Sequence, residues 1–215
     1  MLVIGPTGSG KTPLGRMLEN RGYRGKKCVH FDFGERLRQA AAQGNTDGLD
    51  EEDRDLVRGL LRAGKLLEEE HFYIAATILR RFLTDHNADE AGGPDGLVEP
   101  VEPVEPVKTT LVVLNGLPRH VGQARDVDSI VEVVRVVHLT CSVETVCQRI
   151  GSNAGGDRLG RTDDDIEAVG AKLAIFAART APLIDHYRGI GAEIHTVPVG
   201  PATTAEDAWN ALHGS

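Results

Sequence analysis

The residues most able to do chemistry lie within the first twelve positions of the chain. Residues 5–12 read GPTGSGKT and match the pattern G-x-x-x-x-G-K-[ST] in full. In such a loop, glycines let backbone N–H groups turn inward around phosphate groups, and the helix that follows adds the positive end of its dipole. Lys11 can reach the β- and γ-phosphates of a nucleotide, and the hydroxyl of Thr12 can bind Mg²⁺. We therefore predict that a nucleoside triphosphate and Mg²⁺ bind here, on Gly8, Ser9, Gly10, Lys11 and Thr12.

Five short segments rich in β-branched residues are predicted to be the strands that position this loop: 2–5, 27–31, 110–115, 135–140 and 193–197. Several are nearly continuous apolar runs, as in strands that are buried on both faces of a parallel sheet. Helices are predicted between them, at 13–19, 34–43, 51–63, 71–84, 143–150 and 164–187. The alternation predicts an α/β fold with a doubly wound, five-stranded parallel sheet. Because ligands of such sheets bind beyond the carboxyl ends of the strands, the loops after the first three strands form the candidate site.

The composition limits the classes of function. The 215 residues carry a formal net charge of −8, and 40% of them are apolar. A protein that binds nucleic acid or an anionic membrane needs a basic face, so we expect neither partner. From the first residues we expect no secretory signal, and no apolar stretch approaches the roughly 20 residues that cross a bilayer. The three cysteines, Cys28, Cys141 and Cys147, lack CxxC spacing, so we expect a cytoplasmic protein with free thiols and no zinc site.

Residues 86–108 depart from the alternation of strands and helices. They contain AGGPDG followed by VEPVEPVEPVK, and proline at every third position favours an extended, polyproline-like conformation. We predict that this acidic insertion is a solvated spacer between a helix and the third strand. A docking segment for a partner is the alternative.

Four further segments resemble motifs of the adenylate kinase family of nucleoside monophosphate kinases, in the family's order. Residues 33–38, FGERLR, are similar to T-G-D-x-L-R, and residues 63–67, AGKLL, are similar to A-G-K-L-V. Residues 115–119, NGLPR, with a glutamine four positions on, resemble D-G-F-P-R followed by glutamine. The run from GRTDD at 160–164 to TAPLIDHY at 180–187 resembles the family's G-R-x-D-D … T-A-P-L-I-x-Y-Y helix, the most specific of the four. The resemblance covers nearly the whole chain except the acidic insertion.

The resemblance implies where an acceptor monophosphate binds. Arg38 and Arg119 are expected to clamp its phosphate, since a planar guanidinium group binds phosphate oxygens bidentately. Gln123 is expected to read the Watson–Crick edge of adenine through its amide group. The full set of implied acceptor residues is Phe33, Arg38, Lys65, Leu67, Gly116, Arg119 and Gln123.

The resemblance also implies residues that act on ATP. Arg149 is expected to pack on the adenine of ATP. Arg161 and Lys172 are expected to contact the phosphates from a short lid at about 151–160. Because transfer between two nucleotides brings many negative charges together, catalysis depends on positioning and on neutralising charge. The expected catalytic residues are therefore Lys11, Arg119, Arg161 and Lys172.

Two of the residues that we expect near the metal differ from those of the family. The two aspartates that hold water ligands of Mg²⁺ in the family correspond to Glu35 and Asn115 here. We expect Mg²⁺ at Thr12, Glu35 and Asn115, with the longer Glu35 compensating for the charge that an asparagine lacks. Residues 32–33, Asp-Phe, replace the family's serine and threonine, so an aromatic ring stands where a hydroxyl would lie near the acceptor base.

Together these features predict a P-loop core of residues 1–31 and 67–215, and a helical insert for the monophosphate at 32–66. The expected reaction is transfer of the γ-phosphoryl group of ATP to AMP, giving two ADP, by a monomer that requires Mg²⁺. Two alternatives remain open. One is a kinase for another monophosphate, such as UMP, CMP or a modified nucleotide. The other is a nucleotide-binding regulatory module that has lost transfer activity.

Overall fold

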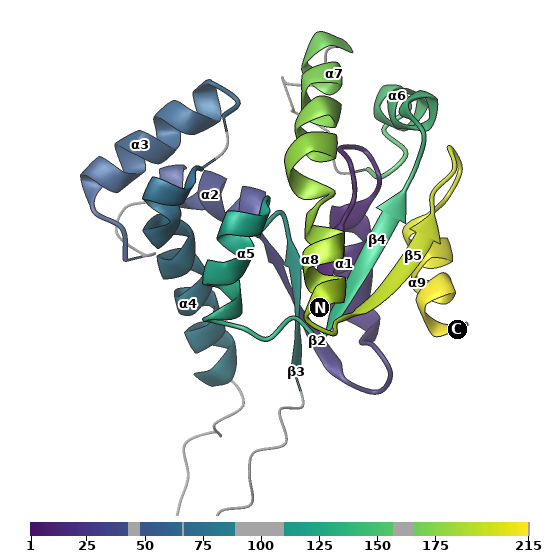
Figure 1. Ribbon diagram of the computed structural model, residues 1–215, viewed down its shortest axis with the longest axis horizontal. Coiled ribbons are helices and arrows are strands. Elements are labelled where there is room, and N and C mark those ends of the chain that lie inside the picture. Colours follow the sequence, from purple (N-terminus) through teal and green to yellow (C-terminus); the bar gives the residue numbers. More distant parts are fainter. Residues whose placement is uncertain (43–47, 66, 89–109, 157–165, 215) are drawn as a thin grey trace, which may run out of the picture.

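A computed structural model describes residues 1–42, 48–65, 67–88, 110–156 and 166–214. Within them, five strands form one parallel sheet in the order β2-β3-β1-β4-β5 (Figure 1). The predicted five-stranded parallel sheet is thereby confirmed, and each strand lies within one residue of its predicted bounds. The strands are β1 (Leu2–Ile4), β2 (Lys27–Asp32), β3 (Thr110–Asn115), β4 (Arg135–Thr140) and β5 (Glu193–Pro198).

Helices cover both faces of the sheet, as expected for a doubly wound fold. On one face, α1 (Lys11–Arg21) and α9 (Ala205–His213) pack over a core that includes Val3 of β1. On the other face, α4 (Phe72–Ala88), α5 (Val121–Asp128) and α8 (Leu183–Gly189) pack over a second core that includes Leu2 and Ile4. Because successive side chains of a strand point to opposite faces, β1 contributes to both cores. This burial fixes β1 at the centre of the sheet, directly before the phosphate loop.

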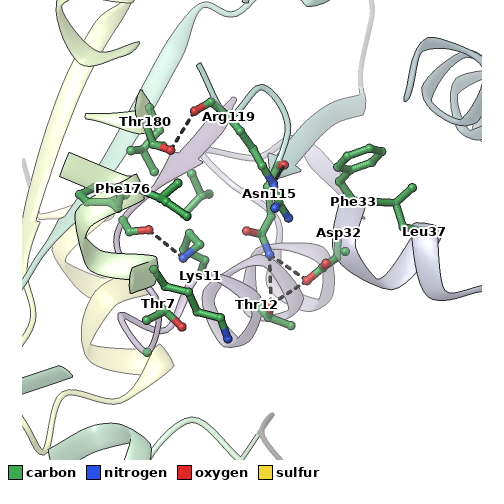
Figure 2. A pocket seen from close by; sticks show the side chains of 18 of the residues that line it. Thr7, Lys11, Thr12, Asp32, Phe33, Leu37, Asn115, Arg119, Phe176 and Thr180 are labelled. Atoms are coloured by element: carbon green, nitrogen blue, oxygen red, sulfur yellow. Dashed lines mark hydrogen bonds between the residues drawn. The ribbon is translucent and has the colours of Figure 1, made fainter. Parts of the chain in front are cut away.

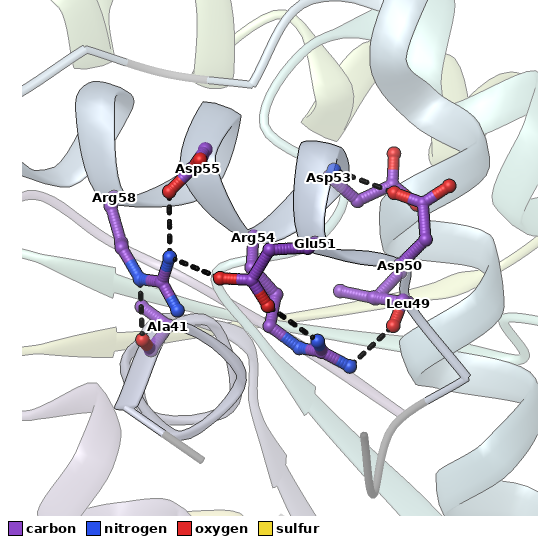
Figure 3. Close-up of polar contacts among 8 residues, drawn as sticks. All are labelled: Ala41, Leu49, Asp50, Glu51, Asp53, Arg54, Asp55 and Arg58. Carbon is purple, nitrogen blue, oxygen red and sulfur yellow. Dashed lines mark hydrogen bonds and ion pairs between the residues drawn. The ribbon is translucent and has the colours of Figure 1, made fainter. Parts of the chain in front are cut away.

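Two helices form most of the predicted insert, α2 (Phe33–Ala42) and α3 (Glu51–Arg62), and they pack against each other. Asp50 caps α3 by accepting a hydrogen bond from the backbone N–H of Asp53 at 2.9 Å. Arg58 of α3 donates from Nε to the carbonyl of Ala41 at 3.0 Å (Figure 3). Arg54, only 6% exposed, donates to the carbonyl of Leu49. These contacts join α3 to α2 and to the turn that precedes it.

The long helix predicted at 164–187 is interrupted. The structure has α7 (Ile166–Ile175), then a π-helical turn (Phe176–Thr180), then α8. The backbone N–H of Ala181 bonds to the carbonyl of Phe176 at 2.9 Å, and Pro182, which follows, has no N–H to continue the helical pattern. The sequence prediction also missed α5 and α9. The second of these begins with a capping box between Thr204 and Asp207, a local signal that was available.

The remaining described helices are α6 (Val143–Gly151) and a short 3₁₀ turn, η1 (Glu69–His71). No helix in the described part of the chain is long and apolar enough to cross a membrane. The lid of 151–160 is described only to residue 156, and the acidic insertion lies outside the described residues from position 89 to 109.

Candidate functional site

A cavity of about 340 Å³ lies where β1, β2 and β3 end, at the edge of the sheet that the strand order predicts (Figure 2). Its volume is in the range of small-molecule sites, roughly 300–1,000 Å³. The phosphate loop forms one side, the ends of β2 and β3 form another, and α7 with its π-helical turn closes a third. Residues from four separate parts of the sequence thus meet in one place.

The phosphate loop has the shape that its glycines allow. Gly10 has φ of 94° and Gly8 has φ of 74°, a left-handed region that other residues rarely adopt. At Gly5 there is no room for a side chain, because a Cβ would lie 2.5 Å from Oγ of Ser9 and 2.9 Å from the carbonyl oxygen of Leu139. Lys11 leads into α1, and its Nζ donates to the carbonyls of Gly5 and Pro6, both at 2.8 Å. The ammonium group therefore lies across the loop that is expected to hold phosphates.

Thr12, Asp32 and Asn115 form a triangle of hydrogen bonds at the ends of α1, β2 and β3 (Figure 2). Thr12 Oγ1 donates to Asp32 Oδ2 at 2.6 Å. Asn115 Nδ2 lies 2.8 Å from the same carboxylate oxygen and 3.0 Å from Thr12 Oγ1. The second carboxylate oxygen of Asp32 accepts from the backbone N–H of Glu35 at 3.0 Å. The carboxylate is therefore held in one orientation by three neighbours.

The surroundings of Asp32 favour its charged form. Burial works against ionisation, but the hydrogen bonds from Thr12 and the Glu35 N–H, with the charges of His30 and Arg38, lower the pKa of Asp32 below its ordinary value. Asp32 therefore brings a fixed negative charge to the phosphate end of the cavity.

Arg119 brings a positive charge to the same cavity. Its Nε donates to the carbonyl of Gly116 at 2.9 Å, and its own carbonyl accepts from Thr180 Oγ1 at 2.8 Å. Burial lowers the pKa of Arg119; the nearby charge of Asp32 opposes this shift, and the charge of Arg38 adds to it. Among the described residues, neither of these arginines has an ion-pair partner within 4 Å. Two adjacent guanidinium groups without a carboxylate partner suit a phosphate group.

Gln123 has a different place from the one expected. It is fully buried, its Oε1 accepts from the backbone N–H of Arg119 at 2.9 Å, and its Nε2 donates to the carbonyl of Leu67 at 2.8 Å. Both ends of the amide are therefore engaged, and Gln123 does not line the cavity. In this structure it holds the Arg119 loop against the end of the insert, and its full burial outside the cavity lining keeps it away from a base edge.

Arg149 also makes contacts that the sequence did not predict. It is 4% exposed, and it donates to the carbonyls of Gly8, Gly200 and Thr203 at 2.9, 2.9 and 2.7 Å. It thereby ties the phosphate loop to the segment between β5 and α9, while still lining the cavity.

Most of the expected site residues come together. Those that line the cavity are Gly8, Gly10, Lys11, Thr12, Phe33, Arg38, Lys65, Leu67, Asn115, Gly116, Arg119, Arg149 and Lys172. Ser9, Glu35 and Gln123 do not line it, and Arg161 lies outside the described residues. The carboxylate of Glu35 lies 3.8 Å from Arg16, and its side chain is 45% exposed. The sequence analysis missed Asp32 and Thr180 as site residues, although Asp32 directly follows a predicted strand and Thr180 begins the TAPL motif.

Comparison with known proteins agrees with the resemblance seen in the motifs. No protein-family model matches the chain. The adenylate kinase of Stenotrophomonas maltophilia strain R551-3 is 29% identical, over 89% of this chain and 86% of its own length. The adenylate kinase of Caulobacter sp. strain K31 is 28% identical over 89% and 85%, and that of Haloarcula marismortui is 25% identical over 99% and 94%.

Among solved structures, a gluconokinase from Sinorhizobium meliloti 1021 matches with a TM-score of 0.46 and 15% identity, covering 99% of this chain and 90% of that one. That likeness is too weak to bear on function. The similarity to curated relatives confirms that this chain resembles the adenylate kinase family along about nine tenths of its length.

Proposed function

We propose that this chain transfers the γ-phosphoryl group of ATP to AMP, giving two ADP. That it is a phosphotransferase of the nucleoside monophosphate kinase type is supported by its relatives and by its phosphate loop. The observation that carries the proposal is one cavity lined both by Lys11 and Thr12 and by Arg38 and Arg119. A donor triphosphate and an acceptor phosphate can therefore bind to the same cavity.

The residues act mainly by position and charge. Phosphoryl transfer needs the attacking and leaving oxygens roughly in line, and it needs cations around the group that moves. Lys11 supplies one cation from the donor side, and Arg119 and Arg38 supply two from the acceptor side. Lys172 on α7 lines the cavity from the third side. When bound, Mg²⁺ would neutralise charge on the phosphates, and Thr12 and Asn115, which line the cavity, would help to hold it.

An apolar wall stands where the acceptor base would lie. Phe33 and Leu37 of α2 and Leu67 after the insert line the cavity beside Arg38. A flat ring such as Phe33 can pack against any base, so this wall supports a nucleotide acceptor without selecting one base. AMP is favoured by the relatives, which are adenylate kinases.

A kinase for a different monophosphate is the second candidate. The observation that favours it is the engagement of both amide ends of Gln123 by Arg119 and Leu67, which leaves the expected adenine reader occupied. A coupled assay for ADP formation, with ATP as donor and AMP, GMP, CMP or UMP as acceptor, separates the candidates. We expect the largest kcat/KM with AMP. A larger kcat/KM with another monophosphate would transfer the proposal to that acceptor.

A further inference from the structure

The carboxylate nearest to the hydroxyl of Thr12 belongs to Asp32, at the end of β2. Oδ2 of Asp32 lies 2.6 Å from Thr12 Oγ1, whereas residue 115, at the end of β3, contributes an amide. In P-loop proteins the hydroxyl at the position of Thr12 binds Mg²⁺, and an aspartate close to it completes the site. At this site the negative charge therefore comes from the Asp32 carboxylate at the end of β2, and the Asn115 amide at the end of β3 is a neutral hydrogen-bond partner.

The donor set around Thr12 leaves room for a cation. A hydroxyl has one hydrogen and two lone pairs. The hydrogen of Thr12 goes to Asp32, one lone pair accepts from Asn115, and the other lone pair stays available. Asp32 itself is held by three neutral donors, and within the described residues no lysine, arginine or histidine lies within 4 Å of its carboxylate. A half-buried carboxylate of this kind, beside an available hydroxyl oxygen, fits a divalent cation with oxygen ligands.

The amide at position 115 follows from the carboxylate at position 32. Asn115 is 4% exposed, and its Nδ2 lies 2.8 Å from Asp32 Oδ2. A carboxylate at position 115 would place two negative charges at hydrogen-bond distance inside the protein, where like charges repel strongly. An amide instead donates to Asp32, and its remaining oxygen can accept a hydrogen bond from water. Residues 32 and 115 are therefore a matched pair, with one charge between them.

Glu35 is not part of this group. Its side chain is on the first turn of α2, its carboxylate lies 3.8 Å from Arg16, and only its backbone N–H contacts Asp32. Glu35 does not line the cavity. The sequence analysis expected Glu35 to replace the negative charge that Asn115 lacks. That charge is available from Asp32, which is already hydrogen-bonded to both Thr12 and Asn115.

We propose that Asp32 supplies the carboxylate of the magnesium site, and that the charge has moved from the end of β3 to the end of β2. This proposal rests on the proposed function, because it concerns the metal of the nucleotide that the enzyme uses. Asp32 acts on the ion that accompanies the phosphates, together with the hydroxyl of Thr12.

The test measures metal binding without turnover. Mn²⁺ replaces Mg²⁺, ADP is the only nucleotide, and electron paramagnetic resonance gives the Kd of Mn²⁺ for the protein–ADP complex. The variants are Asp32→Asn, Glu35→Gln, and the exchange Asp32→Asn with Asn115→Asp. All three keep the shape of the side chains they replace, and the exchange keeps the number of charges in the triangle. Circular dichroism and ADP affinity in the absence of metal report whether each variant is folded.

We expect Asp32→Asn to weaken Mn²⁺ binding at least about tenfold, the scale seen when a partner close to a metal is removed. Glu35→Gln should stay within about twofold of the wild type, and the exchange should recover most of the loss because a carboxylate again faces Thr12. An unchanged Kd in Asp32→Asn, or an equal loss in Glu35→Gln, would overturn the proposal. So would a folded exchange variant that binds Mn²⁺ as weakly as Asp32→Asn, since the effect would then be structural. Mn²⁺ binding can be measured even if the protein does not transfer a phosphoryl group to AMP. The proposal about Asp32 and the proposed function can therefore fail independently of each other.

Discussion

The guanidinium group of Arg179 and the carboxylate of Glu68 form a two-pronged ion pair, with nitrogen–oxygen distances of 2.8 and 2.6 Å. Arg179 belongs to the π-helical turn that lines the cavity, and Glu68 directly follows Leu67 at the end of the insert. In the same turn, Thr180 bonds to the carbonyl of Arg119. The turn is therefore attached both to the acceptor arginine and to the segment that closes the insert.

Removing this ion pair should affect acceptor binding more than stability. The two side chains are 35% and 50% exposed, so Glu68→Gln should lower the free energy of unfolding by less than about 1 kcal/mol. We expect the KM for the monophosphate to rise a few-fold, because Leu67 beside Glu68 lines the cavity. Asp185→Asn breaks the exposed Arg188–Asp185 pair and is the matched control. We expect this variant to leave both the KM for the monophosphate and the free energy of unfolding unchanged. Urea unfolding and steady-state kinetics give the two numbers, and equal KM values in the two variants would contradict the role of the Glu68–Arg179 pair.

Arg38 and Arg119 should act on the acceptor. Arg38→Ala and Arg119→Ala should each raise the KM for the monophosphate and lower kcat, while the Kd for ATP stays within a few-fold. Arg119 should be the more sensitive of the two to replacement by lysine. Its guanidinium also bonds to Gly116, and a lysine cannot bind a phosphate in the same bidentate way. Initial rates at varied acceptor and calorimetric titration of ATP test this. A collapse of ATP affinity with a steady acceptor KM would show that the roles are assigned to the wrong nucleotide.

Stability should fall in mild acid because of buried histidines. Burial is the largest cause that lowers the pKa of His30 below its ordinary value of 6.5, and His120 and His138 shift in the same direction for the same reason. Between the folded and the unfolded pKa, the unfolded chain binds more protons, so the free energy of unfolding decreases as pH falls below 6.5 and levels off below the folded pKa.

The variant His30→Gln should make this decrease smaller. Nε2 of His30 is buried with no hydrogen-bond partner among the described residues, and it lies 2.2 Å from where a Cβ on Gly15 would be. A charge there is disfavoured by burial more than it is favoured by the nearby carboxylates of Asp32 and Glu19. Urea unfolding between pH 8 and pH 5 measures the slope, and His71→Gln, on a more exposed side chain, serves as control. The same slope in His30→Gln and the wild type would remove His30 as the cause.

The acidic insertion should be dispensable for transfer. Its VEP repeat lies outside the described residues, between the end of α4 at Ala88 and the start of β3 at Thr110. The repeat carries the same sign of charge as the substrates, and the cost of closing a loop depends only weakly on its length. Replacing 96–107 by a short Gly/Ser link should leave kcat and KM unchanged and stability within about 1 kcal/mol. Insoluble or unfolded protein would instead mean that the segment packs on the core.

The features that could be predicted from the sequence are those set by residues close together in the chain. The phosphate loop and the strands depend on residues close together in the chain, such as the glycines of 5–12 and the β-branched run of β3. Lys11 and Thr12 were predicted from the phosphate-loop motif, and Arg38 and Arg119 from the resemblance to the adenylate kinase family. All four line one cavity.

The rest depended on contacts between distant residues. Asn115 and Thr12 are 103 positions apart, so the triangle that gives Asp32 its importance exists only once the sheet has formed. Gln123 matched a family pattern, but the carbonyl of Leu67, 56 positions away, competes for its amide. The interruption of the predicted helix at 164–187 had a local signal in Pro182, but the bond from Thr180 of the π-helical turn to the carbonyl of Arg119 is a distant contact.

The measurement that tests the proposed reaction most directly is the stoichiometry of phosphoryl transfer. Wild-type protein is mixed with Mg²⁺, ATP and AMP, and the nucleotides are quantified over time by ³¹P NMR. We expect two ADP for each ATP and each AMP consumed, with no free phosphate. Lys11→Ala should be slower by at least about a hundredfold, because it removes a positioned charge from the transition state. Release of free phosphate from ATP while AMP stays constant, or equal rates for Lys11→Ala and the wild type, would contradict the proposed function.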